Sequence, residues 1–405
     1  MMLTEQQKVL VKATVPILRE SGVALTDYFY KRMLNNNPEL KETFNMGHQR
    51  SGAQASALAG AVLAYAENID DPMVLAPVVE LICNKHVSLN IQAPDYNIVG
   101  ENLLYSISEV LSIPMDAPLI DAWKAAYFQL ADLFIATEKK LYEEQAAKVG
   151  SWVGWRNFVV DKKVRESNEV TSYYFVPEDG KAIPLFKPGQ YVTVRVYVSE
   201  LGIKQPRQYS LSNMPGEDFL RISVKREDPH QEGQNPGYVS STLHNIINEK
   251  DVVELTAPIG NFVLVNPSNV NVLISAGVGL TPMVSMLKSL SNQSSKAVHF
   301  IHTSRGSTAH ALRDEVKGIA SSNDTVKLHI NYRNISSTDV QGEDYHTHGH
   351  LNLNDLSADW LPADADYYLC GPIAFMQEKR KELVEFGISN DRIHSEAFST
   401  GGVPA

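Results

Sequence analysis

The stretch Gln205-Pro206-Arg207-Gln208-Tyr209-Ser210, which follows the turn Lys187-Pro188-Gly189-Gln190-Tyr191, decides how the rest of the chain is interpreted. It has the character of a β-strand, in which successive side chains point to opposite faces. An arginine, an aromatic ring and a hydroxyl in such a segment can hold an anionic tail, cover a flat ring and hydrogen-bond its edge. A flavin dinucleotide needs these three contacts, although an ordinary structural strand can carry the same residues.

The composition narrows the class of protein. A chain of 405 residues is long enough for two or three domains. Its formal net charge of −11 argues against nucleic acid or an anionic membrane as a partner, because such partners bind clustered Lys and Arg. Cys83 and Cys370 are too few for a disulfide framework or a cysteine metal site. No signal peptide or membrane span is evident. We therefore expect a cytoplasmic monomer without stable membrane association, whose partners are small molecules.

Residues 1–148 have the periodicity of successive helices, because apolar residues recur at three and four spacing. This segment contains two histidines. His48 lies in a polar run and is predicted to be in a loop. His86 continues an apolar stripe and is predicted to face inward. That stripe consists of Leu75, Val78, Val79 and Ile82. A histidine on an apolar helical face is usually a packed core residue, so the stripe alone does not assign a metal ligand.

Residues 152–265 change to strand periodicity and predict an antiparallel β-barrel. The predicted strands are 158–164, 170–176, 191–198, 208–212 and 219–225. Near the end of this segment, Gly237-Tyr238-Val239-Ser240-Ser241 opens a short helical pattern. The free N–H groups and the dipole at a helix start favour phosphate. A pyrophosphate site of this kind indicates FAD in preference to FMN.

Residues 266–405 alternate strands and helices, which predicts a mostly parallel sheet with helices on both faces. Two loops follow predicted strands, Gly277-Val278-Gly279-Leu280-Thr281-Pro282 and Gly371-Pro372. Their small residues allow the backbone to approach a dinucleotide. Cys370 precedes the second loop and is either a contact of the nicotinamide or a small buried strand end.

Two polar segments leave alternatives open. Arg305, in Thr303-Ser304-Arg305, can meet a ribose 2′-phosphate or be an ordinary surface arginine, so NADPH and NADH both stay possible. The run His346-Thr347-His348-Gly349-His350 invites a metal interpretation. These alternate histidines lie in a polar loop and lack an evident carboxylate or cysteine partner for a metal, so solvated histidines are the better prediction.

The whole chain resembles the bacterial flavohaemoglobins. The globin part of the resemblance is carried by Phe29-Tyr30-Lys31-Arg32-Met33, Asn37-Pro38-Glu39-Leu40-Lys41, Phe44-Asn45-Met46, Asn84-Lys85-His86 and Tyr96-Asn97-Ile98-Val99-Gly100-Glu101. The flavin motif and the two glycine loops resemble the ferredoxin-reductase superfamily. The resemblance implies a multi-domain protein with an all-α globin domain (1–148), an antiparallel β-barrel FAD domain (152–265) and an α/β NAD(P)-binding domain (266–405).

For the globin segment, the resemblance implies haem b with His86 as the iron ligand and Phe44 packed on the haem face. It places Tyr30, Gln54 and Leu58 on the distal side. It also places Tyr96 and Glu138 beside His86, where a carboxylate makes the imidazole more basic. Without the resemblance, Glu138 is predicted to be a solvated charge, because Lys139 and Lys140 follow it.

For the reductase segment, the resemblance implies that Tyr209 lies on the isoalloxazine, that Ser210 approaches its N5 edge and that Arg207 meets phosphate. The other implied FAD residues are Tyr191, Gln208, Val239 and Ser240. The closing strand implies that Glu396 and Lys85 approach the haem edge and that the flavin is covered by Ala397, Phe398, Ser399 and Thr400. Ala397 and Ser399-Thr400 depart from the cysteine and glycine-proline that are common in this strand.

The resemblance implies that NAD(P)H reduces FAD, that FAD passes single electrons to haem, and that NO and O2 become nitrate. Tyr30 and Gln54 are expected to hydrogen-bond the dioxygen substrate. This is the activity of a nitric oxide dioxygenase. Two alternatives stay open. The same electron chain could reduce peroxides, including lipid hydroperoxides, or the globin could store O2 while its reductase keeps the iron ferrous.

Overall fold

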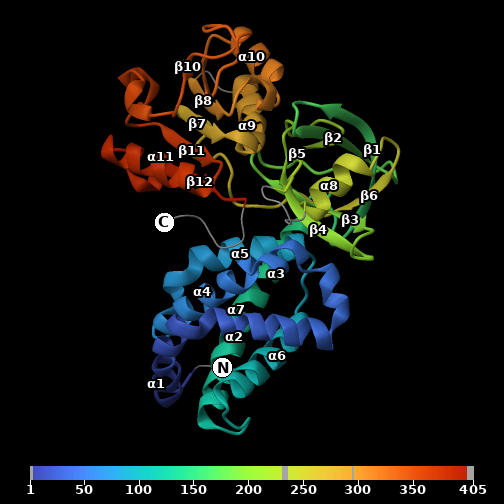
Figure 1. The fold of residues 1–405 in the computed structure, drawn as a ribbon, viewed down its shortest axis with the longest axis vertical. Coiled ribbons are helices and arrows are strands. Elements are labelled where there is room, and N and C mark those ends of the chain that lie inside the picture. The colour runs from blue at the N-terminus through green and yellow to red at the C-terminus, as the bar shows by residue number, and fades with distance from the viewer. Residues whose placement is uncertain (1–2, 230–235, 294–295, 399–405) are drawn as a thin grey trace. The chain divides into compact units, whose positions relative to one another are not determined.

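The computed structural model of the protein describes residues 3–229, 236–293 and 296–398. The chain divides into two compact units (Figure 1). The first contains Met1–Trp155 and Arg195–Arg207, and the second contains Arg156–Val194 and Gln208–Phe398. The domain boundaries expected near residues 148, 152 and 265 remain predictions.

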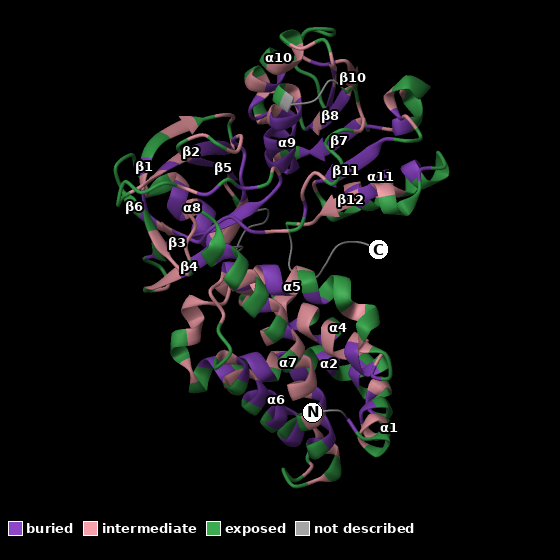
Figure 2. Ribbon diagram, turned by 180° about the vertical axis from the view of Figure 1, so that it is seen from behind, coloured by how far each residue is buried: buried purple, intermediate pink, exposed green. Residues whose placement is uncertain are grey.

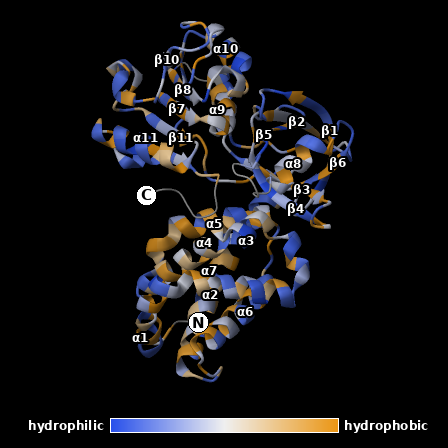
Figure 3. Cartoon of the chain, viewed as in Figure 1, coloured by the Kyte–Doolittle hydropathy of each residue, from blue (hydrophilic) through white to orange (hydrophobic). Residues whose placement is uncertain are grey.

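The first unit is built from helices, as its periodicity predicts (Figure 1). They are α1 (Glu5–Ala13), α2 (Val15–Asn36), α3 (Met46–Ser51), α4 (Ala53–Glu67), α5 (Ala76–Ser88), α6 (Asp95–Leu111) and α7 (Pro118–Ala147), with the short 3-10 helices η1 (Pro38–Glu42) and η2 (Pro72–Leu75). The core contains large buried side chains such as Phe29, Met33 and Trp123. Both hydrophobic and hydrophilic residues occur along these helices (Figure 3).

The structure corrects two predictions in this unit. His48 is not in a loop but in α3, which begins at the cap Asn45 and ends at Gly52. The side chain of Asn45 accepts hydrogen bonds from the N–H groups of Gly47 and His48, which explains why so short a helix forms here. Val78 is 50% exposed and does not face inward with His86. It lies about 100° around the helix from its neighbour Val79, which is buried.

A six-stranded sheet has the order β4-β3-β6-β1-β2-β5 and lies mostly in the second unit, but its segment Arg195–Arg207 is grouped with the first. Its strands are β1 (Arg156–Arg165), β2 (Val170–Pro177), β3 (Tyr191–Val198), β4 (Ile203–Ser210), β5 (Leu220–Lys225) and β6 (Val252–Leu255). Strand β1 pairs antiparallel with β2 and β6, and β2 pairs antiparallel with β5. The antiparallel architecture is therefore confirmed. β6 was not predicted, and β4 starts five residues earlier than expected.

A second six-stranded sheet has the order β10-β9-β8-β7-β11-β12, with parallel pairing throughout. Its strands are β7 (Asn271–Ala276), β8 (Val298–Ser304), β9 (Val326–Tyr332), β10 (Thr347–His348), β11 (Asp366–Cys370) and β12 (Ile393–Glu396). The main helices around it are α9 (Leu280–Gln293), α10 (Arg313–Ser321) and α11 (Ile373–Glu385); α8 (Tyr238–Asn245) precedes β6.

Alternate residues of the parallel sheet enter two different cores. Leu273 and Tyr368 pack in the core that includes the residues of α9, whereas Val272 and Tyr367 pack in the core that includes those of α11. The sheet is buried from both sides (Figure 2). This arrangement confirms the predicted parallel sheet with helices on both faces. Across the part of the chain that the structure describes, no helix has the length and apolar character needed to cross a membrane.

Candidate active site

Three side chains from different helices of the first unit form a hydrogen-bonded group, the His86 cluster. It consists of His86 on α5, Tyr96 on α6 and Glu138 on α7. Nδ1 of His86 lies 2.8 Å from Oε1 of Glu138 and 3.0 Å from the Tyr96 hydroxyl oxygen. The Tyr96 hydroxyl donates to the same carboxylate oxygen over 2.6 Å. Glu138 is 3% exposed, so it is not the solvated charge that its lysine neighbours suggest.

This network determines which nitrogen of His86 is available. The Tyr96 hydroxyl has a single proton, and it donates that proton in a hydrogen bond to the Glu138 carboxylate. Nδ1 of His86 must therefore carry its own proton and donate it to Glu138. Nε2 is then left with its lone pair, and it has no hydrogen-bonding partner among the described residues. A histidine held in this tautomer by a carboxylate has the donor chemistry that haem iron needs.

Aromatic packing holds the cluster rigid. Phe134 lies 5.8 Å from His86 and 6.3 Å from Tyr96 between ring centroids. The Tyr127 hydroxyl donates to the carbonyl of Tyr96 over 2.6 Å. The Tyr127 ring lies so close to Gly100 that a Cβ there would be 2.5 Å from it. Burial raises the pKa of Tyr96, and the carboxylate of Glu138 raises it further, so the hydroxyl stays a donor. Tyr127 was not predicted, and Gly100 belongs to a motif of the family resemblance but was given no site role; a glycine inside a helix was the available signal.

A second group, the Tyr30 cluster, consists of Tyr30, Phe44, Gln54 and Leu58. Tyr30 is buried on α2, with the Phe44 ring edge-on at 5.7 Å between centroids. Burial raises the pKa of Tyr30, and a hydrogen bond from Gln54 opposes that rise only in part. The Gln54 amide is itself fixed by Gln49, whose Nε2 donates to Oε1 over 3.0 Å. Leu58 packs on the same core. The structure therefore brings these four predicted residues into one region of the first unit.

The seam between α2 and α4 positions this group. The buried Thr26 hydroxyl donates to the carbonyl of Ala55 over 2.7 Å. Thr26 lies one turn before Tyr30, and Ala55 follows Gln54. This hydrogen bond therefore joins α2 to α4 within one turn of Tyr30 and next to Gln54.

The flavin motif lies along β3 and β4. Tyr191 begins β3 and is buried, and its N–H and C=O each bond to Ile259 over 2.9 Å. Its ring packs against Gly260, where a Cβ would lie 2.9 Å from the ring. The end of β4 contains Arg207, Gln208, Tyr209 and the buried Ser210. Arg207 and Lys85, both in the first unit, lower the pKa of His48, which burial already depresses, to about 4.

The predicted phosphate site lies at the start of α8. No side chain caps the first turn of this helix, so its N–H groups can meet an anion. The Ser240 hydroxyl accepts from the N–H of Glu227 over 3.2 Å. A Cβ on Gly237 would lie 2.7 Å from that hydroxyl oxygen, so the approach requires glycine. Val239, adjacent to Ser240, is buried in the same turn.

The two glycine loops meet. Strands β7 and β11 are neighbours, so their carboxyl ends lie together. A Cβ on Gly279 would be 2.4 Å from the carbonyl oxygen of Cys370, and Gly277 has φ of +53°. Thr281 is buried and donates its hydroxyl proton to the carbonyl of Val278 over 3.1 Å. The remaining loop residues, Leu280, Pro282, Gly371 and Pro372, flank this contact.

Strand β12 lies beside β11, with Glu396 in register with Cys370. Cys370 is fully buried, and burial raises the pKa of its thiol well above the ordinary value. Ala397 is partly buried, whereas Phe398 is 48% exposed. The predicted residues Ser399 and Thr400 lie outside the described residues. Lys85 and Glu396 belong to different units.

The two polar segments, around Arg305 and at His346–His350, both make specific contacts in the structure. Arg305 is a surface arginine whose side chain is 68% exposed and pairs with Glu169. Thr347 and His348 form β10, and His350 pairs with Glu378 over 2.6 Å. His348 and His350 are exposed, as predicted, whereas His346 is half-buried and accepts from the N–H of Ile330 over 3.0 Å. No group of three or more metal-binding side chains occurs within residues 3–229, 236–293 and 296–398.

Comparison with known proteins identifies the class. The globin model matches residues 27–133, and the oxidoreductase NAD-binding domain model matches residues 273–381. The fold and the site therefore define an oxidoreductase in which a globin is joined to a nicotinamide-dependent reductase of the ferredoxin-reductase type. The flavohemoprotein of Bordetella parapertussis is 51% identical over 405 residues, which cover 99% of this chain and 100% of that protein. The chain belongs to the flavohemoprotein family, which confirms the resemblance.

Two solved structures agree with this assignment. Flavohemoglobin from Malassezia yamatoensis, with bound FAD and heme, matches with a TM-score of 0.84 at 30% identity, covering 98% of this chain and all of that chain. The FAD/NAD-binding domain of nitric oxide dioxygenase from Vibrio cholerae matches with a TM-score of 0.55 at 38% identity. That match covers 60% of this chain and 98% of that domain.

Proposed function

We propose that this protein is an NAD(P)H-driven nitric oxide dioxygenase, which converts NO and O2 to nitrate and thereby detoxifies NO. Membership of the flavohemoprotein family supports the proposal, as does the similarity to the Vibrio cholerae domain. The observation that carries it is the buried carboxylate of Glu138 on Nδ1 of His86.

We further propose that His86 holds haem b, that Tyr191, the Arg207–Ser210 segment and the start of α8 hold FAD, and that the two glycine loops hold NADPH or NADH. When bound, these groups supply hydride transfer, single-electron transfer and a redox-active iron. The free lone pair on Nε2 of His86 and the close approach of the loops at Gly279 fit this set.

The His86 cluster favours turnover over storage. By accepting the Nδ1 proton, Glu138 makes Nε2 a stronger electron donor. A protein that only stores O2 gains nothing from a stronger donor. Tyr96 keeps the carboxylate in place by donating to the oxygen that His86 also uses.

The Tyr30 cluster can hold dioxygen by hydrogen bonding. Because burial raises the pKa of Tyr30, its hydroxyl stays protonated at neutral pH and remains a donor. Donors preorganised toward developing negative charge are most effective where water is excluded. Phe44 and Leu58 supply the apolar surroundings.

The test uses purified holoprotein with NADPH or NADH. Each hydride carries two electrons and each NO with O2 takes one, so two nitrates should form per nicotinamide oxidised. Parallel assays should follow cumene hydroperoxide consumption and reversible O2 binding. Faster peroxide consumption than NO consumption would favour the peroxidase alternative, and O2 binding with neither activity would favour storage.

We also propose that the protein acts as a monomer in the cytoplasm. Both cysteines, Cys83 and Cys370, are free and buried, which suits a reducing compartment. Light scattering after size exclusion tests the monomer, and cell fractionation tests the location.

A further inference from the structure

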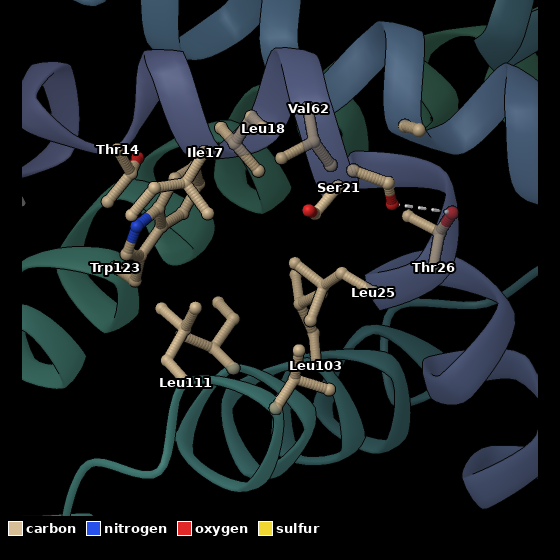
Figure 4. Close-up of a pocket in the computed structure, with 14 residues that line it drawn as sticks. Thr14, Ile17, Leu18, Ser21, Leu25, Thr26, Val62, Leu103, Leu111 and Trp123 are labelled. Atoms are coloured by element: carbon tan, nitrogen blue, oxygen red, sulfur yellow. Dashed lines mark hydrogen bonds between the residues drawn. The ribbon is translucent and has the colours of Figure 1, made fainter.

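The first unit contains a cavity that no predicted cofactor or substrate residue lines. It has a volume of about 30 Å³ and lies among helices α2, α4, α6 and α7 (Figure 4). Figure 4 shows apolar side chains arranged around it, most of them from α2 and α6. Prominent among the lining residues are Leu18, Leu25, Val62, Leu103, Leu111 and Trp123.

The cavity is suited to apolar contents and not to water. A buried water needs two to four polar partners. The hydroxyls of Thr14 and Thr26 are already committed, to the carbonyls of Val11 and Ala55 over 2.6 Å and 2.7 Å. Ser21 contributes one further hydroxyl, which is too few. A volume of about 30 Å³ admits roughly one small apolar ligand, such as a diatomic gas or a single xenon atom, and nothing much larger.

The position of the cavity relates it to the Tyr30 cluster. Thr26 on its wall lies one helical turn before Tyr30, and Ala59 on its wall follows Leu58. The wall also includes Ile17 and Val110, which are 45% and 39% exposed. One part of the wall is thus accessible to solvent, and another part is made by the helices that carry the cluster.

We propose that this cavity is a docking site for apolar diatomic gases, from which NO or O2 reaches the Tyr30 cluster. The identity of the gases rests on the proposed function. The existence of an apolar gas site does not, because it depends only on the volume and the lining. The two can therefore fail separately.

Gly22→Ala is the test variant. Gly22 lines the cavity, and a Cβ there would lie 3.5 Å from the Cβ of Ala59, which is ordinary contact. The added methyl therefore occupies cavity space without a clash. Gly60→Ala is the matched control: it makes the same change inside α4, at an exposed position with nothing within 4 Å of the new Cβ. Both changes raise helix propensity, so both variants should melt no lower than the parent.

The first measurement is xenon binding to the full-length holoprotein, by xenon NMR and by xenon-pressurised crystals. We expect one xenon in the cavity of the parent and of Gly60→Ala, with at least tenfold weaker binding in Gly22→Ala. No xenon in the parent, or equal binding in Gly22→Ala, would overturn the docking site.

The second measurement is carbon monoxide association with the reduced holoprotein after flash photolysis. We expect a severalfold slower rate in Gly22→Ala and an unchanged rate in Gly60→Ala. An unchanged rate in Gly22→Ala, despite lost xenon binding, would overturn the role in delivery. Slower association in a protein that consumes no NO would support the docking site while refuting the proposed function.

Discussion

At the scale of single residues, Glu138 sets the chemistry of the site by fixing one proton. It accepts the Nδ1–H of His86 and the Tyr96 hydroxyl through the same oxygen. The ring nitrogen that remains is therefore always the unprotonated one. A neutral acceptor at this position would still accept the Nδ1–H and so preserve the tautomer, but it would remove the negative charge. Such a substitution therefore measures the effect of the charge alone.

We predict that Glu138→Gln lowers haem affinity or NO consumption by about 10- to 100-fold, the usual effect of losing a carboxylate behind a metal-bound histidine. Haem titration and steady-state NO consumption measure it. The control is Glu143→Gln on the same helix. Its side chain is 65% exposed and makes only a long ion pair, of 3.9 Å, with Lys139. Wild-type values for both variants would refute the role of Glu138.

A second residue-scale prediction concerns Tyr30. Tyr30→Phe removes the buried donor and should raise the KM for O2 by about tenfold, which is about 1.4 kcal/mol. Because the pKa of Tyr30 is raised, this difference should persist from neutral pH to about pH 9. Tyr28→Phe is the control, since its hydroxyl bonds to Glu109 at the surface. Identical O2 dependence in the two variants would show that Tyr30 does not contact the substrate.

At the scale of elements, a buried ion network joins the antiparallel sheet to the helices of the parallel sheet. Arg221 on β5 meets Glu315 on α10, over 2.8 Å and 3.2 Å from its two terminal nitrogens. Lys288 on α9 lies 3.1 Å from the same carboxylate. Two cations therefore share one anion, and Arg221 is almost fully buried.

We predict that Glu315→Gln destabilises the second unit by about 2–4 kcal/mol, because it leaves buried Arg221 without its counter-charge. Urea unfolding measures this. Combining it with Arg221→Met should recover much of the loss, since removing both charges abolishes the unpaired ion. Glu227→Gln breaks only an exposed pair with Lys225 and should cost less than about 1 kcal/mol. A Glu315→Gln effect as small as that would contradict the network's importance.

The elements also show what the sequence can predict. Long periodic segments, such as α7 and the strands of the parallel sheet, follow from their residue patterns. Short elements do not, because they depend on caps and partners. Helix α3 depends on Asn45 and Gly52, and the two-residue strand β10 exists only through its pairing with β9.

The same limit applies to the site. The stripe on α5 predicts that His86 faces inward, but it does not predict a partner. Glu138 lies 52 residues further along the chain and precedes two lysines. Its burial results from the packing of α7 against α5, which only the family resemblance indicated in advance. Tyr127 supports Tyr96 from 31 residues away, and no pattern in the sequence links them.

At the scale of the whole molecule, buried histidines are distributed unequally between the units. In the first unit the pKa of His48 is lowered to about 4, chiefly by burial. In the second unit burial lowers the pKa of His244, His299, His302, His310, His329, His346 and His394. An unfolded histidine has a pKa of about 6.5, so below that pH the unfolded chain binds more protons than the folded one. Stability is therefore lost as pH falls, mainly in the second unit.

We predict that His302→Gln reduces this acid sensitivity. The pKa of His302 is lowered to about 3 by complete burial. Keeping His302 neutral in the folded protein therefore lowers the free energy of unfolding progressively between pH 6.5 and pH 3, by about 2 kcal/mol at pH 5. Between pH 7 and pH 5 the free energy of unfolding of the variant should fall by about 2 kcal/mol less than that of the parent, whatever the stability of the variant at pH 7. Urea unfolding at both pH values measures the difference.

The matched control for this prediction is His348→Gln in the same sheet, where the side chain is exposed. It should retain the acid sensitivity of the parent, because an exposed side chain is not removed from water on folding. Flavin fluorescence, which rises when FAD is released, and the Soret band, followed together during acidification, should show the second unit unfolding before the first. Equal acid sensitivity in the parent and in His302→Gln would mean that His302 is protonated in the folded protein. Simultaneous loss of both spectroscopic signals would mean that the two units do not unfold separately.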